Sequence, residues 1–183
     1  VYAYPTRIER NRAVRAAVQA ARGRVPVIVG IGALRTDDAQ NLARDAEAEG
    51  ADGLLMAPVS YTPLTQDETF QHYKAVTEAT SLPLCIYNNP STTHFTFTKE
   101  LLCRLSDVPN IKAVKIPPPK EGEVARELTE LRASPVGALA IGYSGDWIAA
   151  EALLAKCDGW FSVLGGFLPK IACQLSEAAL KED

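Results

Sequence analysis

Apolar and polar positions follow two alternating patterns along the chain. Short, continuous apolar runs rich in β-branched residues indicate strands that are buried on both faces. These runs predict strands at residues 25–31, 52–57, 82–87, 111–115, 136–141 and 159–163. Between them, apolar residues recur at the three- and four-residue spacing of an amphipathic helix.

Residues that favour helix starts precede most of the amphipathic segments. Thr6 with Glu9, and Thr65 with Glu68, form capping boxes. Thr98 and Asp146 are expected to cap two further helices. The expected helices cover residues 6–22, 36–49, 65–79, 98–105, 123–131 and 148–154, and the last one opens at Pro169.

Strand and helix alternate in units of roughly 20–30 residues, which is typical of parallel strands joined by helical crossovers. Two α/β architectures fit, an open doubly wound sheet and a (β/α) barrel. No G-x-G-x-x-G motif follows the first predicted strand, which weakens the dinucleotide-binding form of the open sheet. A complete barrel has eight strands in about 250 residues. The barrel interpretation therefore expects that two N-terminal strands are missing, which would leave two exposed sheet edges.

Composition indicates an ordinary globular protein and excludes several classes. Hydrophobic residues make up 47% of the 183 residues, and the net charge of −3 gives no reason to expect a nucleic acid or an anionic membrane as partner. No apolar run is long enough to span a bilayer, and no signal segment opens the chain. Two histidines, His72 and His94, are few for a metal site, and we expect His94 to lie on a solvent-exposed loop. We expect Trp147 and Trp160 to be packing residues. The cysteines lack C-x-x-C spacing, and we expect reduced, buried thiols in a cytoplasmic protein at Cys85, Cys103, Cys157 and Cys173.

Lys115 closes the fourth predicted strand, and the prolines at 117–119 prevent that strand from continuing. Parallel sheets and barrels carry their chemistry at the carboxyl ends of strands. Apolar walls there would lower the pKa of Lys115, and a free amine can form a Schiff base with a carbonyl. Tyr87 ends the preceding strand, where its hydroxyl could relay protons. The alternatives are a solvated strand-end lysine and a core tyrosine with a locally bonded hydroxyl.

Two motifs at these strand ends resemble a known family. The pentapeptide 86–90 (I-Y-N-N-P), followed one strand later by Val114 and Lys115, resembles the Y-N-x-P motif and strand-end lysine of the dihydrodipicolinate synthase/N-acetylneuraminate lyase superfamily. The resemblance covers nearly the whole chain, including the segments RVPVIVG at 24–30, GADG at 50–53, AP at 57–58, HY at 72–73 and SGD at 144–146. It implies a class I, pyruvate-dependent aldolase or lyase on a (β/α)8 TIM barrel. Six of the eight strands would then be present in a single domain, 1–183, truncated at the N-terminus and also at the C-terminus.

The resemblance also implies roles for individual residues. Lys115 would form the imine with pyruvate or another 2-oxo acid, and Tyr87 would act as general acid and base. Tyr61, or Ser60 in its place, would serve as the relay group that one subunit donates to another. The substrate-binding residues would be Ser60, Thr92, Gly142, Ser144 and Phe161. No metal or cofactor is needed, and relatives suggest a homo-oligomer, either a tetramer or a dimer.

The chain departs from the family pattern at two places. The G-x-T-G-E segment that binds the pyruvate carboxylate in the family would fall before Val1. Where lysine-pathway synthases carry an arginine after Y-N-x-P, this chain has Thr92, Thr93 and His94. Without a guanidinium, a bidentate grip on a second carboxylate is lost, so we expect a partner substrate other than aspartate semialdehyde.

Other functions fit the same residues. The same imine would support a sugar-acid dehydratase or a hydratase-aldolase of the superfamily. A non-catalytic homologue that binds a small oxo acid is another alternative. A phosphate-binding barrel enzyme would instead use the backbone N–H groups of Gly165 and Gly166, for which a simple tight turn is the competing interpretation.

Overall fold

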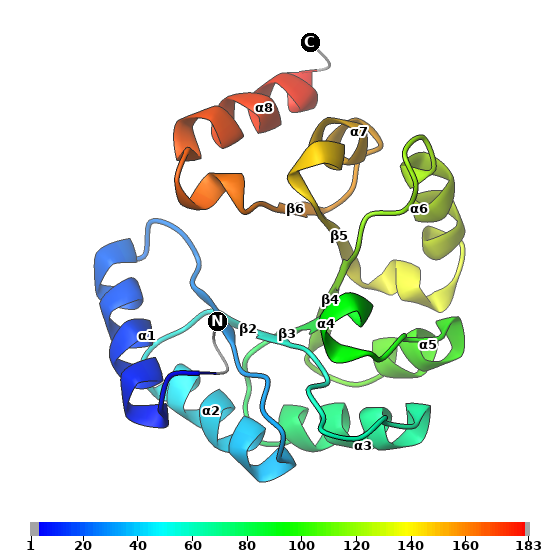
Figure 1. Cartoon of the computed structure of the whole chain (residues 1–183). Helices are drawn as coiled ribbons and strands as arrows, with labels where there is room; N and C mark the ends of the chain where they lie inside the picture. The colour runs from blue at the N-terminus through cyan, green and yellow to red at the C-terminus, as the bar shows by residue number, and fades with distance from the viewer. Residues whose placement is uncertain (1–3, 182–183) are drawn as a thin grey trace. The chain divides into compact units, whose positions relative to one another are not determined.

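Strands and helices alternate along residues 4–181, the part of the chain that the computed structural model describes (Figure 1). The strands are β1 (Ile28–Gly30), β2 (Gly53–Met56), β3 (Leu84–Tyr87), β4 (Ile111–Ile116), β5 (Ala140–Ser144) and β6 (Gly159–Phe161). The α-helices are α1 (Arg7–Ala21), α2 (Thr36–Ala48), α3 (Gln66–Thr77), α4 (Pro90–Thr93), α5 (Lys99–Ser106), α6 (Val124–Arg132), α7 (Ala149–Leu154) and α8 (Pro169–Lys181). Two compact units, residues 1–112 and 113–183, are described separately below.

The N-terminal unit is built on three parallel strands. β1 pairs with β2, and β2 pairs with β3. Helices α2 and α3 lie side by side against these strands (Figure 1). β2 and β3 are buried along most of their length, as their continuous apolar sequences predict. Tyr73 of α3 is fully buried there, and its hydroxyl donates a 2.5 Å hydrogen bond to the carbonyl oxygen of Met56.

β1 differs from the prediction in both length and burial. The apolar run 25–31 predicts a long buried strand, but only Ile28–Gly30 is a strand, and Val25 and Ile28 are 61% and 55% exposed. Within the described residues, β1 pairs with β2 alone. A strand with one partner leaves part of its surface uncovered, which matches the expected open sheet edge.

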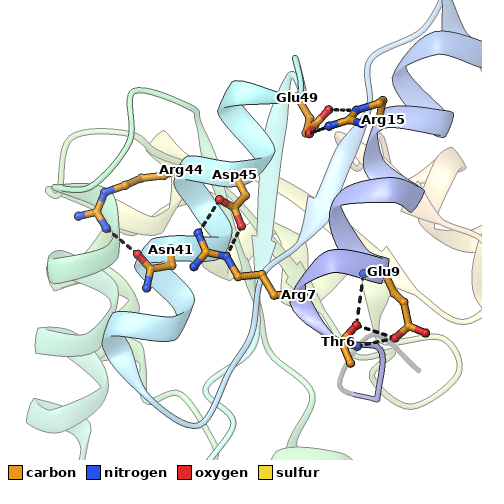
Figure 2. Close-up of polar contacts among 8 residues, drawn as sticks. All are labelled: Thr6, Arg7, Glu9, Arg15, Asn41, Arg44, Asp45 and Glu49. Carbon is orange, nitrogen blue, oxygen red and sulfur yellow. Dashed lines mark hydrogen bonds and ion pairs between the residues drawn. The ribbon is translucent and has the colours of Figure 1, made fainter.

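Helix α1 is attached to α2 through charged side chains (Figure 2). The guanidinium of Arg7 donates two hydrogen bonds, of 2.5 and 2.7 Å, to the carboxylate of Asp45. Arg15 makes the same two-pronged contact with Glu49, at 2.8 and 2.6 Å. No residue of α1 is buried. The described contacts between α1 and α2 are therefore dominated by bidentate ion pairs.

The predicted helix caps are confirmed at three of four positions. Both capping boxes form, at Thr6 with Glu9 and at Thr65 with Glu68. The hydroxyl of Thr98 accepts a hydrogen bond from a backbone N–H of α5. The prediction for Asp146 is wrong, because α7 begins without a side-chain cap. The Asp146 carboxylate binds a different segment, described below.

The C-terminal unit contains a second set of parallel strands. Residues 113–116 of β4 pair with β5, and β5 pairs with β6. The predicted strand 136–141 is wrong in its first half, where Pro135–Ala138 forms a 3₁₀-helix and β5 starts only at Ala140. Pro135 has no N–H to give to a ladder, and the N–H of Gly137 closes a turn onto the carbonyl of Ser134. Within this turn Val136 is buried, whereas Pro135, Gly137 and Ala138 are exposed.

Several predictions about burial need correction. Trp147, expected to be a packing residue, is 80% exposed. Cys173, expected to be buried, is exposed, whereas Cys85 is buried, and none of the four cysteines in the described residues forms a disulfide. His94 is exposed, as expected for a loop histidine. No helix within residues 4–181 combines the length and the apolar character that a membrane span requires.

Candidate active site

Tyr87 is the last residue of β3, and its half-buried hydroxyl accepts a 3.2 Å hydrogen bond from the side-chain amide of Asn89. The same amide donates to the hydroxyl of Thr92 at 3.0 Å. Burial raises the pKa of Tyr87, and the bond from Asn89 opposes that shift in part. The phenol therefore keeps its proton at neutral pH and can donate it.

Asn89 is a functional candidate that the sequence reasoning missed. Its backbone carbonyl accepts hydrogen bonds from the N–H groups of Thr92 and Thr93, which forms the short helix α4. Its side chain joins two predicted site residues, Tyr87 and Thr92. The signal was present in the I-Y-N-N-P pentapeptide, but a sequence motif does not reveal which amide reaches the phenol.

Ser60 and Tyr61 follow β2 at the same end of the unit. Ser60 makes a local turn: its hydroxyl donates to the carbonyl of Thr62 and accepts from the N–H of Thr62. It also lines a cavity of about 610 Å³ with Thr36 and His72. Tyr61 is 95% exposed. The N-terminal unit by itself therefore gives Tyr61 no packed position, unlike Tyr87.

Lys115 lies on β4, one residue before its end, and is half-buried. Its ammonium nitrogen is 5.0 Å from the centre of the Phe161 ring. Lys115 is paired in register with Gly142 of β5. A Cβ atom placed on Gly142 would come within 2.6 Å of the Phe161 ring. The C-terminal unit thus brings together three of the predicted site residues, Lys115, Gly142 and Phe161.

Ser144 ends β5 and is paired in register with Phe161 of β6. Two residues later, Asp146 holds the segment that follows β6. Its carboxylate accepts hydrogen bonds from the hydroxyl of Ser162 at 2.9 Å and from the N–H groups of Val163 and Leu164, at 3.2 and 2.9 Å. This role was missed because an aspartate ahead of an apolar helical segment has the pattern of a cap.

The glycine pair after β6 forms a closed turn. The N–H of Gly165 donates to the hydroxyl of Ser162 at 2.7 Å, and the N–H of Gly166 donates to the carbonyl of Val163 at 3.0 Å. Both amides are therefore already used within the turn. The phosphate-binding interpretation of Gly165 and Gly166 is wrong, and the tight-turn alternative holds.

The two units carry different parts of the candidate chemistry. The N-terminal unit supplies a protonated phenol, Tyr87, ordered by Asn89, and the C-terminal unit supplies an amine, Lys115, beside an aromatic ring. The approach of Tyr87 to Lys115 stays a prediction. Among the described residues, no group of three or more histidine, cysteine, aspartate or glutamate side chains is arranged to hold a metal ion.

Solved structures share this fold over almost the entire chain. Dihydrodipicolinate synthase from Agrobacterium tumefaciens is 57% identical, with a TM-score of 0.94 over 98% of this chain and 60% of that one. The synthase from Acinetobacter baumannii, solved in complex with pyruvate, is 31% identical, with a TM-score of 0.86 over 98% of this chain and 60% of that one. The fold is that of the (β/α)8 TIM-barrel family, with six βα strands in the described residues.

Curated sequences give the same result. The chain is 38% identical over 176 residues to 4-hydroxy-tetrahydrodipicolinate synthase from Alcanivorax borkumensis, and 33% identical over 175 residues to that of Neisseria meningitidis serogroup B. These matches cover 96% of this chain but only 58% and 59% of the relatives' lengths. The model of the dihydrodipicolinate synthetase family matches residues 6–182. The chain belongs to the dihydrodipicolinate synthetase family.

Proposed function

We propose that the native protein is a class I lyase or aldolase in which Lys115 forms a Schiff base with pyruvate or a related 2-oxo acid. The observation that carries the proposal is the position of Lys115. It lies near the carboxyl end of a parallel strand, half-buried, beside a glycine in register and an aromatic ring. Barrels place their reactive groups at this end of the strands. The family match and the pyruvate complex of the Acinetobacter baumannii relative support this assignment.

The proposed chemistry begins when the Lys115 nitrogen attacks the 2-oxo carbon. A C–N bond forms, the carbonyl oxygen takes up two protons and leaves as water, and a protonated imine remains. The imine nitrogen then draws electrons from the neighbouring C–H bond, whose proton passes to a base, and an enamine results. The enamine carbon forms a new C–C bond with the carbonyl carbon of a second substrate, whose C=O π bond breaks and whose oxygen takes up a proton, and the protonated imine forms again. Water finally hydrolyses the imine and regenerates the amine.

Tyr87 is proposed as the general acid and base for these proton transfers. Its pKa, raised by burial, keeps the phenol protonated at neutral pH, so it can donate a proton to the departing hydroxyl group. The amide of Asn89 fixes the direction of the phenol oxygen. Tyr61, or Ser60, is proposed as the next group in the relay, and the exposure of Tyr61 suits a side chain that enters another subunit.

The second substrate is proposed to differ from that of the lysine-pathway synthases. Thr92, Thr93 and His94 follow the Y-N-x-P motif where those enzymes carry an arginine. Thr92 already accepts a hydrogen bond from Asn89. A carboxylate is bound most strongly by the two parallel N–H donors of a guanidinium. The hydroxyl groups of Thr92 and Thr93 are better suited to a neutral polar group on the second substrate. Loss of water from the imine of a hydroxylated oxo acid is the close alternative reaction.

The oligomeric state and the cellular location are also part of the proposed function. We propose a cytoplasmic homo-oligomer, a dimer or tetramer, that acts on a small 2-oxo acid without a metal or an organic cofactor. The exposed Tyr61 supports assembly. Ser144 is proposed to contact the substrate from the strand end next to Lys115.

Borohydride trapping with pyruvate tests the proposal. Sodium borohydride reduces a protein imine to a stable amine, so the native protein should gain the mass of one reduced pyruvyl group, on the peptide that carries Lys115. Lys115→Met should abolish the adduct. Lys112→Met is the matched control, since Lys112 lies on the same strand and is exposed. A folded native protein that stays unmodified would contradict the proposal and favour the non-catalytic homologue.

A further inference from the structure

Phe161 occupies space that is open only because residue 142 is glycine. A Cβ atom on Gly142 would lie 2.6 Å from Cε2 and 3.2 Å from Cδ2 of the ring, and 3.0 Å from the backbone carbonyl oxygen of Gly159. Real Cβ atoms do not approach aromatic carbons that closely, so any side chain at 142 would displace the ring. Gly142 is paired in register with Lys115, whose ammonium lies 5.0 Å from the centre of the same ring. A displaced ring would therefore disturb the surroundings of the amine.

The segment that directly follows Phe161 is held by Asp146. Residues 162–164 donate three hydrogen bonds to the carboxylate of Asp146, through the hydroxyl of Ser162 and the N–H groups of Val163 and Leu164. Ser162 also accepts the N–H of Gly165. Phe161 thus immediately precedes a segment whose donors converge on one carboxylate. Asp146 itself sits directly after Gly145, whose φ of +95° is a conformation that glycine adopts readily.

We propose that Phe161 is a positioning residue for the amine of Lys115, that Gly142 admits its ring, and that Asp146 fixes it. This inference rests on the proposed Schiff-base function. A lysine side chain has four rotatable bonds and loses substantial entropy when it is ordered. An aromatic face attracts the cationic end of the chain and limits the positions it can take. The amine then meets the incoming carbonyl in a restricted geometry, which raises the rate of attack.

In this view Gly142 makes room for the ring and does not touch the substrate. The two roles have different consequences for double variants. If Gly142 only makes room, a methyl group at 142 harms imine formation mainly because it pushes the ring. Removal of the ring should then remove most of the harm and leave only the tighter contact with the Gly159 carbonyl oxygen. If Gly142 contacts the substrate, the harm should persist in the absence of the ring.

The test measures the rate of borohydride-trapped adduct formation with pyruvate, in the whole native protein. Gly142→Ala should slow trapping by about 100-fold, the effect of a misplaced reactive group. Phe161→Ala should slow it by about tenfold through looser positioning, mainly in the maximal rate and not in the pyruvate concentration at half-maximum. Gly142→Ala combined with Phe161→Ala should trap faster than Gly142→Ala alone and approach the rate of Phe161→Ala, because the 2.6 Å contact is with the ring.

Asp146→Asn adds a second, independent cycle. The side-chain amide of the variant has one acceptor oxygen fewer than the Asp146 carboxylate. The 162–164 segment should therefore be held less firmly, and adduct trapping should slow. In the Phe161→Ala background, Asp146→Asn should have no further effect, because Asp146 acts through the ring. A merely structural role would slow both backgrounds equally. This cycle tests the positioning role of Phe161 even if Gly142→Ala fails to fold.

The outcomes separate this inference from the function on which it rests. Absence of any adduct in the native protein would contradict the proposed function. Normal adduct formation with unaltered rates in Phe161→Ala would overturn the positioning role alone. A Gly142→Ala defect that persists undiminished in the double variant would overturn the role of Gly142 in admitting the ring.

Discussion

The side-chain amide of Asn89 donates a hydrogen bond of 3.2 Å to the hydroxyl of Tyr87. Burial raises the pKa of this phenol, and the Asn89 amide lowers it by stabilising the phenolate. The two influences make the proton affinity of Tyr87 adjustable through a single neighbour. They also predict how the protein responds to alkaline pH.

Asn89→Ala should raise the pKa of Tyr87 further, because a hydrogen bond that opposes the effect of burial would be lost. The folded-state pKa already lies above the ordinary tyrosine value of about 10. The stability linked to this group is therefore full below that pH and falls as the pH rises toward the folded-state value. An NMR titration of the Tyr87 ring carbon that bears the hydroxyl measures the shift. A lower midpoint in Asn89→Ala would contradict this assignment of the hydrogen bond.

His72 should make the protein sensitive to mild acid. Burial lowers its pKa below 6.5, and its Nδ1 lies 2.9 Å from the hydroxyl of Thr36. Stability linked to the neutral ring is therefore complete above pH 6.5 and is lost as the pH falls through the folded-state pKa. His72→Gln should reduce the difference between the urea unfolding midpoints measured at about pH 7 and at about pH 5. His94→Gln is the control, because exposed His94 should leave the acid sensitivity unchanged.

The ion pairs between α1 and α2 should make the docking of α1 depend on salt. Arg7→Gln with Arg15→Gln removes both bidentate contacts, and backbone amides of α1 should then exchange faster with deuterium. High salt should speed exchange in the original protein, since the screening length falls to about 3 Å at 1 M. Arg12→Gln, at an exposed position on the same helix, is the control. Equal exchange at low and high salt would indicate that apolar contacts hold α1.

Tyr73 should contribute to stability through its hydroxyl as well as its ring. Tyr73→Phe removes the donor to the Met56 carbonyl without changing the ring packing. A lost hydrogen bond in a buried site costs about 1 kcal/mol in the free energy of unfolding. Urea unfolding measures the loss, and Tyr61→Phe should show none because Tyr61 is 95% exposed.

Sequence patterns predicted the fold where burial alone decides the structure. The runs 52–57, 82–87 and 111–115 became Gly53–Met56, Leu84–Tyr87 and Ile111–Ile116, because buried parallel strands carry uninterrupted apolar sequence. The run 136–141 misled, since the 3₁₀-helix Pro135–Ala138 is as apolar as a short strand although Val136 is its one buried residue. An apolar pattern alone does not separate a short strand from a turn of the same composition.

For the candidate site, strand ends were predictable and hydrogen-bond partners were not. Lys115 and Tyr87 follow from the position of the strands and from the family motifs. The roles of Asn89 and Asp146 depend on which donors the folded chain brings within 3 Å or so of their side chains. Asp146 shows the difficulty, because it binds a segment that lies 16 to 18 residues away.

Among residues 4–181, β1 pairs with a strand on one side only, and this has a consequence for handling the chain. Along Ile28–Gly30, peptide groups on the other side are available to any extended segment that approaches, and the exposed Ile28 side chain makes such an approach favourable. A polypeptide of this length, prepared without a segment that covers β1, is expected to self-associate through strand addition. The extent of self-association should increase with protein concentration. Detergent-free light scattering across a dilution series would reveal this tendency directly.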